Sequence, residues 1–157
     1  MRKISVLLAT LGLMIAGALF PVASAQAASA NCDAQWRSAT SGHFYAYDLI
    51  NCVTKLGNTS GTDSNWGDSS GAFHSGDTND AASILHKGTS GMAVKVYDKT
   101  GYTGAAACIK KSEFYASNLI NNYLTGGGPG SGRVSAYDTI SSHKWVRESA
   151  CGGAFLD

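Results

Sequence analysis

The sequence predicts an all-β protein in which two Greek-key motifs pack as a sandwich. Only 15% of the residues are charged and glycine occurs 19 times, a composition typical of short strands joined by turns. Several short segments alternate apolar and polar residues with the period of a strand. The tripeptide AYD at 46–48 recurs as VYD at 96–98, which indicates a duplicated unit.

Residues 1–30 are predicted to be a secretory signal. A basic start and an almost wholly apolar stretch at 4–20 precede a run of small residues. A signal peptidase needs small residues at its cleavage site, so cleavage is expected after Ala25 or Ala30. The apolar stretch is short for a membrane anchor, which is the alternative. We therefore expect residues 31–157 to form one secreted, extracellular domain.

The charge of the mature chain argues against two classes of partner. Loss of Arg2 and Lys3 with the signal leaves ten basic residues against eleven acidic ones, a net charge near −1. This balance provides no electrostatic basis for binding nucleic acid or an anionic membrane. No second long apolar run follows the signal. We expect a monomer with no nucleic acid and no membrane as partner.

Four cysteines remain in the mature chain: Cys32, Cys52, Cys108 and Cys151. An even number in an exported domain indicates two disulfides, for which three pairings are open. No CxxC pair is present, so zinc is not expected. We favour Cys32 with Cys52 and Cys108 with Cys151, because each bond would tie a terminal segment to its own half of the chain.

Six segments have the pattern of strands: 43–48, 51–56, 83–87, 92–98, 105–110 and 140–147. The first Greek key is expected at about 42–88 and the second at about 91–148. Polar, turn-forming stretches separate the strands, notably 57–80, in which Trp66 and Phe73 are isolated anchors, and the glycine-rich 125–133. Helix is expected for at most a turn or two near 112–122.

Tyr97, Tyr102 and Gly104 form a possible hairpin signature. The spacing is aromatic, four residues, aromatic, one residue, glycine. Two rings can pack as a platform beneath a turn, and glycine allows the positive φ of a fold-back. This spacing resembles the hairpin motif of the βγ-crystallin superfamily, in which the first hairpin of each Greek key folds back over the sheet. In the first half Cys52 and Thr54 stand in place of the second aromatic and the glycine, so that hairpin is expected to be degenerate and held by a disulfide.

A second superfamily motif, Asn/Asp-Asn/Asp-x-x-Ser/Thr-Ser, supplies oxygen ligands in the calcium-binding members. The residues that match it are Asn79, Asp80 and Ser83 in the first half and Asp138 and Ser141 in the second. The resemblance implies that these residues bind calcium, with one site weakened because Tyr137 occupies the first position of its motif. Calcium is the only cofactor expected. The alternative is that both segments are turns in which Asp and Ser bond nearby backbone amides.

No catalytic residues are predicted, and we expect the protein not to be an enzyme. Gly67-x-Ser69-x-Gly71 has the spacing of a nucleophile elbow, but it lies in a polar loop without the preceding strand and following helix that an elbow needs. The four histidines lack the spacing of a zinc pair. His86 and His143 follow the two serine motifs and are expected at the surface or in hairpins.

The resemblance covers residues 42–148 and is greatest to the bacterial secreted branch, which includes disulfide-bonded metallopeptidase inhibitors and killer-toxin-like proteins. It implies a binding protein whose partner is a secreted peptidase, bound by a rigid loop at 57–76 or 121–133. Two alternatives remain open. One is a calcium-binding structural or cell-surface module, and the other is a small antimicrobial, killer-toxin-like protein.

Overall fold

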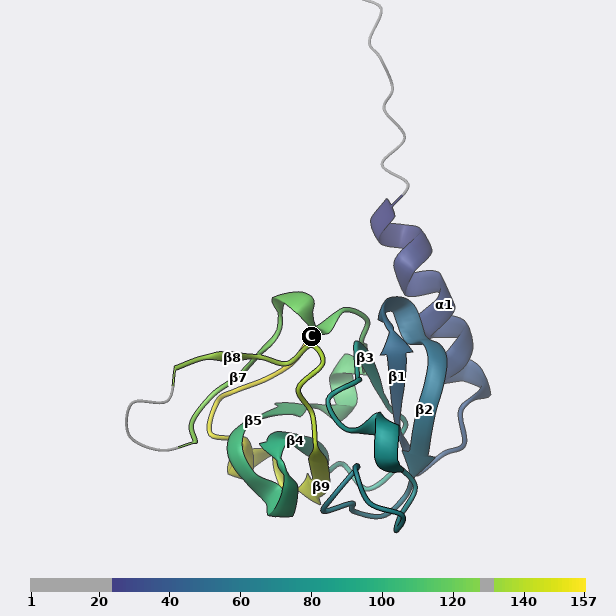
Figure 1. Ribbon diagram of the computed structural model, residues 1–157. Helices are drawn as coiled ribbons and strands as arrows, with labels where there is room; N and C mark the ends of the chain where they lie inside the picture. The colour runs from purple at the N-terminus through teal and green to yellow at the C-terminus, as the bar shows by residue number, and fades with distance from the viewer. Residues whose placement is uncertain (1–23, 128–131) are drawn as a thin grey trace, which may run out of the picture.

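The computed structural model describes residues 24–127 and 132–157 (Figure 1). Residues 1–23 of the predicted signal and 128–131 of the glycine-rich segment lie outside this part. The elements are α1 (Ser24–Ser38), β1 (Phe44–Leu49), β2 (Val53–Thr59), β3 (Ser83–His86), β4 (Ala93–Lys99), β5 (Thr103–Ile109), β6 (Tyr115–Ala116), β7 (Tyr123–Leu124), β8 (Val134–Ser135) and β9 (Ser142–Val146). Within the described ranges, no helix combines the length and apolar character needed to span a membrane.

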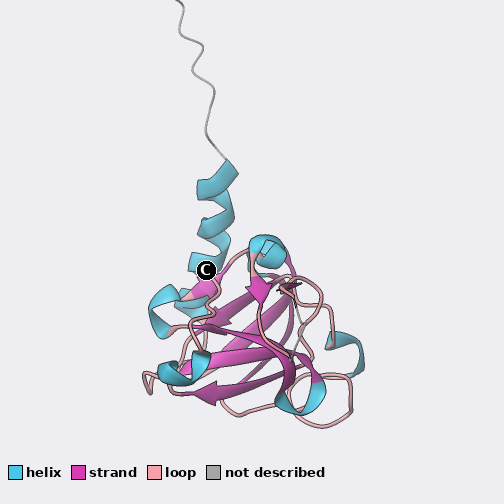
Figure 2. Ribbon diagram, turned by 90° about the vertical axis from the view of Figure 1, so that its left-hand side faces the viewer, coloured by secondary structure: helices cyan, strands magenta, loops and turns pink. Residues whose placement is uncertain are grey.

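Two antiparallel sheets form the body of the protein, in the orders β2-β1-β3-β6 and β5-β4-β9. Figure 2 shows the strands at the centre, with short helical turns around them. The inner faces meet in one apolar core, to which Phe44 and Ile84 contribute from the first sheet and Val94, Val96 and Ile109 from the second. All five are fully buried, as expected where alternate residues of a strand face a second sheet. The prediction of a two-sheet, all-β protein is confirmed, and all six predicted strands are present.

The two halves repeat one hairpin. β1 and β2 are joined by the 3₁₀ turn Ile50–Cys52, and β4 and β5 by the 3₁₀ turn Thr100–Tyr102. The backbone angle φ at equivalent positions is 62° and 68° at Asn51 and Gly101, 57° and 60° at Cys52 and Tyr102, and 56° and 82° at Thr54 and Gly104. The first hairpin is held by the Cys32–Cys52 disulfide in place of a ring pair, as expected, and its backbone matches that of the second hairpin despite the different side chains.

Each half also supplies a short segment to the sheet of the other half. β6 belongs to the second half but pairs with β3 of the first. Conversely, Asp63 belongs to the first half and bridges to His143 of β9. The neighbouring backbone bonds agree, since the N–H of Trp66 donates to Ser141 O and that of Leu119 to Ala82 O, both at 3.0 Å. This exchange gives the halves one shared core.

The helix α1 was not predicted. Its sequence, SAQAASANCDAQWRS, is rich in alanine, which favours helix, but it overlaps the predicted signal. From Cys32 onward the helix packs on the outer face of the first sheet, against Tyr45, Tyr47 and Leu85. Figure 1 shows its N-terminal end projecting away from the sheets. The region 112–122 holds parts of two single 3₁₀ turns, Lys111–Glu113 and Leu119–Asn121.

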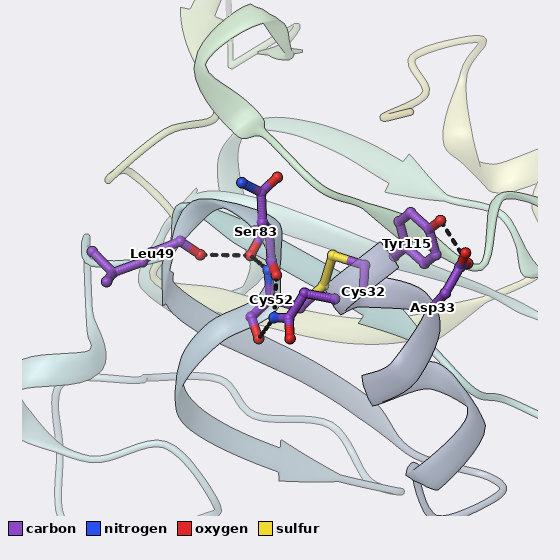
Figure 3. The surroundings of a disulfide bond; sticks show 8 residues. Cys32, Asp33, Leu49, Cys52, Ser83 and Tyr115 are labelled. Atoms are coloured by element: carbon purple, nitrogen blue, oxygen red, sulfur yellow. Dashed lines mark hydrogen bonds between the residues drawn. A yellow bond between two sulfur atoms is a disulfide. The ribbon is translucent and has the colours of Figure 1, made fainter. Parts of the chain in front are cut away.

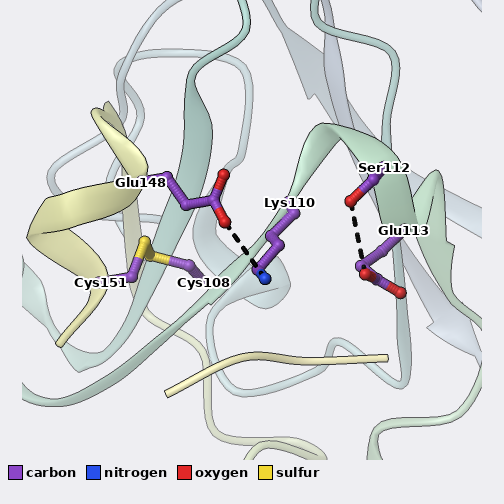
Figure 4. Close-up of polar contacts among 6 residues, drawn as sticks. All are labelled: Cys108, Lys110, Ser112, Glu113, Glu148 and Cys151. Carbon is purple, nitrogen blue, oxygen red and sulfur yellow. Dashed lines mark hydrogen bonds and ion pairs between the residues drawn. A yellow bond between two sulfur atoms is a disulfide. The ribbon is translucent and has the colours of Figure 1, made fainter. Parts of the chain in front are cut away.

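Both disulfides have the pairing favoured from the sequence. Cys32–Cys52 fastens α1 to the turn of the first hairpin (Figure 3). Cys108–Cys151 fastens the C-terminal segment to β5 on the outer face of the second sheet (Figure 4). Each disulfide therefore holds a segment of chain against the outer face of one sheet, which the shared core does not stabilise.

Candidate functional site

The residues predicted to bind calcium lie on two loops that meet between the halves. One loop precedes β3 and the other precedes β9. The N–H of Asn79 donates to Ile140 O at 2.9 Å, and the N–H of Asp138 donates to Ala81 O at 3.1 Å. Asn79 and Asp138 also share a left-handed backbone, with φ of 59° and 51°. These two residues are therefore equivalent in the two halves.

The strand register aligns the serine motifs of the two halves one residue differently from the sequence comparison. Ser83 and Ser142 each lie opposite the tyrosine of the AYD or VYD tripeptide. The sequence equated Ser83 with Ser141, whereas the structural equivalent of Ser141 is Ala82. A slip of one residue along a strand moves a side chain to the opposite face. The corrected alignment thus places Ser83 and Ser141, which the sequence motif had treated as equivalent, at non-equivalent positions.

The hydroxyl of Ser83 fastens the first hairpin (Figure 3). It donates to Leu49 O at 2.7 Å and accepts from the N–H of Cys52 at 3.0 Å. Ser142 makes the equivalent two bonds in the second hairpin, at 2.6 and 3.2 Å. Both serines are fully buried. In this structure the Ser83 hydroxyl is engaged with backbone groups.

The hydroxyl of Ser141 lies within hydrogen-bond distance of uncharged oxygen atoms. It lies 2.9 Å from Asn79 Oδ1, 3.2 Å from the carbonyl oxygen of Asp98 and 3.1 Å from the hydroxyl of Thr78. The Ser141 side chain is almost wholly buried. Hydroxyl, amide and carbonyl oxygens are all calcium ligands, but the hydrogen bonds of this group include no carboxylate.

The equivalent place in the other half has carboxylates instead. Asp138 replaces Asn79 there, and Ala82 replaces the serine. The pKa of the Asp138 carboxyl is raised, first by desolvation and then by the negative charges of Asp80 and Asp48. Among the described residues, no three His, Cys, Asp or Glu side chains are placed to hold a metal ion. The fit to calcium is partial, since carboxylates and the serine hydroxyl belong to different half-sites.

The predicted tyrosine platform is a contact between the rings of Tyr97 and Tyr102, whose centroids are 6.0 Å apart at 60°. The ammonium group of Lys144 lies 4.9 Å from the centroid of the Tyr102 ring. Gly104 has φ of 82°, and a Cβ atom at this position would collide with the Asp98 carboxylate. The glycine is therefore required both by the backbone and by this close approach.

The long polar segment 57–80 is anchored in the core. Trp66 and Phe73 are fully buried and stack with centroids 4.1 Å apart at 10°. The carboxylate of Asp63 accepts from the N–H of Asn65 at 3.0 Å and from the N–H of Phe73 at 3.4 Å. One buried carboxylate therefore holds both ends of the intervening stretch.

The GxSxG match lies on the exposed part of this segment. Ser69 is exposed, and in the described part of the chain its hydroxyl has no hydrogen bond to a histidine or carboxylate. The backbone around it forms a turn, in which Asp68 Oδ1 accepts from the N–H of Ser70 at 2.7 Å. The geometry supports the interpretation of this match as a loop.

His86 and His143 are buried, so the expectation that they lie at the surface is wrong. Nε2 of His86 lies 2.8 Å from Met92 O, and Nδ1 accepts from the N–H of Gly88 at 3.1 Å. Burial lowers the pKa of His86, and it lowers the pKa of His143 to about 3. The burial of these histidines could not be predicted from the sequence, because the correct alignment of the two serine motifs is known only from the strand pairing.

No model of a known protein family matches the sequence, and none of the curated proteins is significantly similar to it. Among solved structures, the chain is similar to one described as "Evolution of the eye lens beta-gamma-crystallin domain fold", with 12% sequence identity and a TM-score of 0.43. The similarity covers 69% of this chain and 89% of the other.

Proposed function

We propose that the protein is a secreted, non-enzymatic binding protein of the peptidase-inhibitor type, akin to the bacterial secreted branch of the βγ-crystallin superfamily. The kinship is supported by the repeated hairpin, with its tyrosine pair in one half and its disulfide in the other. The observation that carries the inhibitor function is the anchoring of residues 64–76 by Asp63, Trp66 and Phe73.

The exposed part of this loop is held by its own hydrogen bonds. The N–H of Ser75 donates to Asp68 O at 3.1 Å, and the N–H of His74 donates to Asp77 Oδ2 at 2.7 Å. A loop that is ordered before binding loses little conformational entropy in a peptidase cleft. The same restraint opposes the distortion needed for cleavage. Of the two loops considered from the sequence, 57–76 therefore fits the role better than 121–133.

The test is to titrate the mature, oxidised protein against secreted metallo- and serine peptidases. We expect at least one to be inhibited. Replacing Asp63 by Ala releases both ends of the loop, so this variant should inhibit more weakly and be cleaved within 64–76, as mass spectrometry of the products would show.

Asn122→Ala is the matched control, because Asn122 is also a buried polar anchor but ties the chain to Asp157, with bonds of 3.0 Å in both directions. It should lower stability without exposing 64–76 to cleavage. Inhibition of no peptidase by the wild-type protein would refute the proposal.

Calcium binding is a second candidate function. It is supported by the negative charges of Asp48 and Asp80 beside Asp138, since a divalent cation would relieve their repulsion. Asn79, Asp80 and Asp138 would supply side-chain oxygens, and Ser141 its hydroxyl. Because hydroxyl and carboxylates are divided between the half-sites, we expect weak binding.

This proposal predicts that the melting temperature rises on adding millimolar calcium and that the rise is lost in Asp80→Ala. Asp77→Ala is a matched control, since the Asp77 carboxylate instead accepts a hydrogen bond from the N–H of His74 in the loop 57–76. An unchanged calcium response in Asp80→Ala would count against the site. A growth-inhibition assay with the same protein separates the antimicrobial alternative, which predicts killing of neighbouring microbes without peptidase inhibition.

A further inference from the structure

Two adjoining cavities lie on one side of the molecule and share Gly88 and Thr89 in their linings. The smaller, of about 160 Å³, is lined by Trp36 and Phe114. The larger, of about 400 Å³, is lined by Trp145. Aromatic side chains from distant parts of the chain therefore line two cavities that adjoin at Gly88 and Thr89.

Phe114 has two features that core packing does not explain. Its side chain is 46% exposed, and its backbone has φ of 60° and ψ of −49°, a strained conformation for a bulky residue. Its ring contacts Trp36 edge-on, with centroids 4.8 Å apart at 68°. Ala116 pairs with Ile84 and Asp63 with the equivalent His143, so the position equivalent to Phe114 in the other half is Gly61 and the fold itself does not require an aromatic residue there.

Two lysines give the Phe114 end of this lining a positive charge. The ammonium group of Lys87 lies 3.2 Å from the centroid of the Trp36 ring, and Lys111 donates to Thr89 O at 3.2 Å. The ion pair found among the described residues is Lys110 with Glu148, at 3.1 Å (Figure 4). Within that part of the chain, Lys87 and Lys111 have no carboxylate at ion-pair distance and remain able to bind an anion.

We propose that the two cavities form a binding site for an acidic polysaccharide. The C–H faces of sugar rings pack on accessible aromatic rings, here the exposed Phe114 and the half-buried Trp145, which provide apolar area on rigid side chains. Lys87 and Lys111 would bind the carboxylate or phosphate groups of the chain. The hydroxyl of Thr89, between the two cavities, would bond sugar hydroxyls. Nucleic acid, which also combines negative charge with rings that can stack on aromatic side chains, is an outcome that the experiment below distinguishes.

The first experiment measures binding of the mature, oxidised protein by calorimetry to polygalacturonate, phosphorylated dextran, neutral dextran and oligo(dT). We expect binding to at least one of the two anionic polysaccharides, at least about tenfold tighter than to dextran. Preference between those two identifies carboxylate or phosphate as the recognised group. Equal binding to dextran, tighter binding to oligo(dT), or no binding to either anionic polymer would overturn the proposal.

Variants separate binding from folding. Phe114→Gly should weaken binding about tenfold without lowering the melting temperature substantially, because glycine accepts the positive φ. Lys87→Gln with Lys111→Gln should weaken binding similarly and reduce its salt dependence. Tyr123→Ala is the control, since Tyr123 is an exposed aromatic with Arg133 4.1 Å above its ring but lies outside both cavities. Wild-type binding by Phe114→Gly or by the double lysine variant, or weakened binding by Tyr123→Ala, would contradict the assignment.

Discussion

Trp66 and His143 join the two halves of the protein through a buried hydrogen bond, in which the indole N–H donates to His143 Nδ1 at 2.9 Å. Because Nδ1 accepts this bond, the proton of the neutral ring is on Nε2. That atom is buried and has no hydrogen-bond partner in the described part of the chain. Protonation would place a positive charge in an apolar site and break the bond to Trp66.

This bond predicts a loss of stability in acid. Burial lowers the folded-state pKa of His143 from 6.5 to about 3. Between these values the unfolded chain binds a proton that the folded chain does not, so His143 lowers the free energy of unfolding by about 1.4 kcal/mol for each pH unit below 6.5. His86 acts in the same direction, since burial also lowers its pKa. Urea unfolding at pH 7.0 and 4.5 measures the effect.

His143→Phe should be less stable than wild type at pH 7, because Trp66 loses its acceptor, but should show a shallower pH dependence. His74→Gln, which changes an exposed histidine, should retain the wild-type slope. A slope unchanged in His143→Phe would show that this histidine is not the titrating group.

The matched hairpins predict opposite effects of two glycine exchanges. Thr54 is a β-branched residue with φ of 56°, at the position equivalent to Gly104 with φ of 82°. Thr54→Gly should raise the free energy of unfolding by about 1 kcal/mol, because it removes backbone strain. Gly104→Ala should lower it by about 2 kcal/mol or more, because the new Cβ collides with Asp98. Chemical unfolding of both variants tests this, and a loss of stability in Thr54→Gly would show that the hairpins are not equivalent.

The hydroxyls of Ser83 and Ser142 should stabilise their two hairpins to a comparable extent. Ser83→Ala and Ser142→Ala each remove a buried hydroxyl that serves as both donor and acceptor for hairpin backbone groups. Leaving those groups unpaired should cost about 1–3 kcal/mol in either variant. Ser112→Ala, at an exposed hydroxyl 3.5 Å from Glu113 (Figure 4), is the control and should be nearly neutral. Thermal unfolding of all three variants would reveal any inequality.

The disulfides should differ in their contribution according to the length of chain they close. The residues are 20 apart in Cys32–Cys52 and 43 apart in Cys108–Cys151. Loop-closure entropy predicts losses of about 3.3 and about 4.0 kcal/mol when each pair is changed to Ala. Denaturant unfolding of the two double variants measures these values, and a larger loss for Cys32–Cys52 would show that docking of α1 contributes beyond chain entropy.

The helix and the histidines show where local sequence information was insufficient. The segment of α1 has an alanine-rich composition that suits both a helix and the end of a signal, and the packing of its residues from Cys32 onward on Tyr45, Tyr47 and Leu85 involves residues distant in the sequence. His143 lies in a segment whose sequence resembles a polar turn. It is buried because β9 pairs with β4 and also bridges to Asp63 of the other half. These contacts join residues far apart in the sequence, so no local pattern predicts them.

The sequence by itself determined the strands, the duplication and the hairpin of Tyr97, Tyr102 and Gly104, because alternation, turn chemistry and the backbone freedom of glycine act over a few residues. It also contained enough to favour the disulfide pairing. Only the tertiary structure decided that Ser83 corresponds to Ser142, that the halves exchange a segment, and that Lys87 and Phe114 meet at one cavity. These relationships depend on contacts between residues far apart in the chain. A shift of one residue in the register of a strand would turn each of its side chains to the opposite face of the sheet.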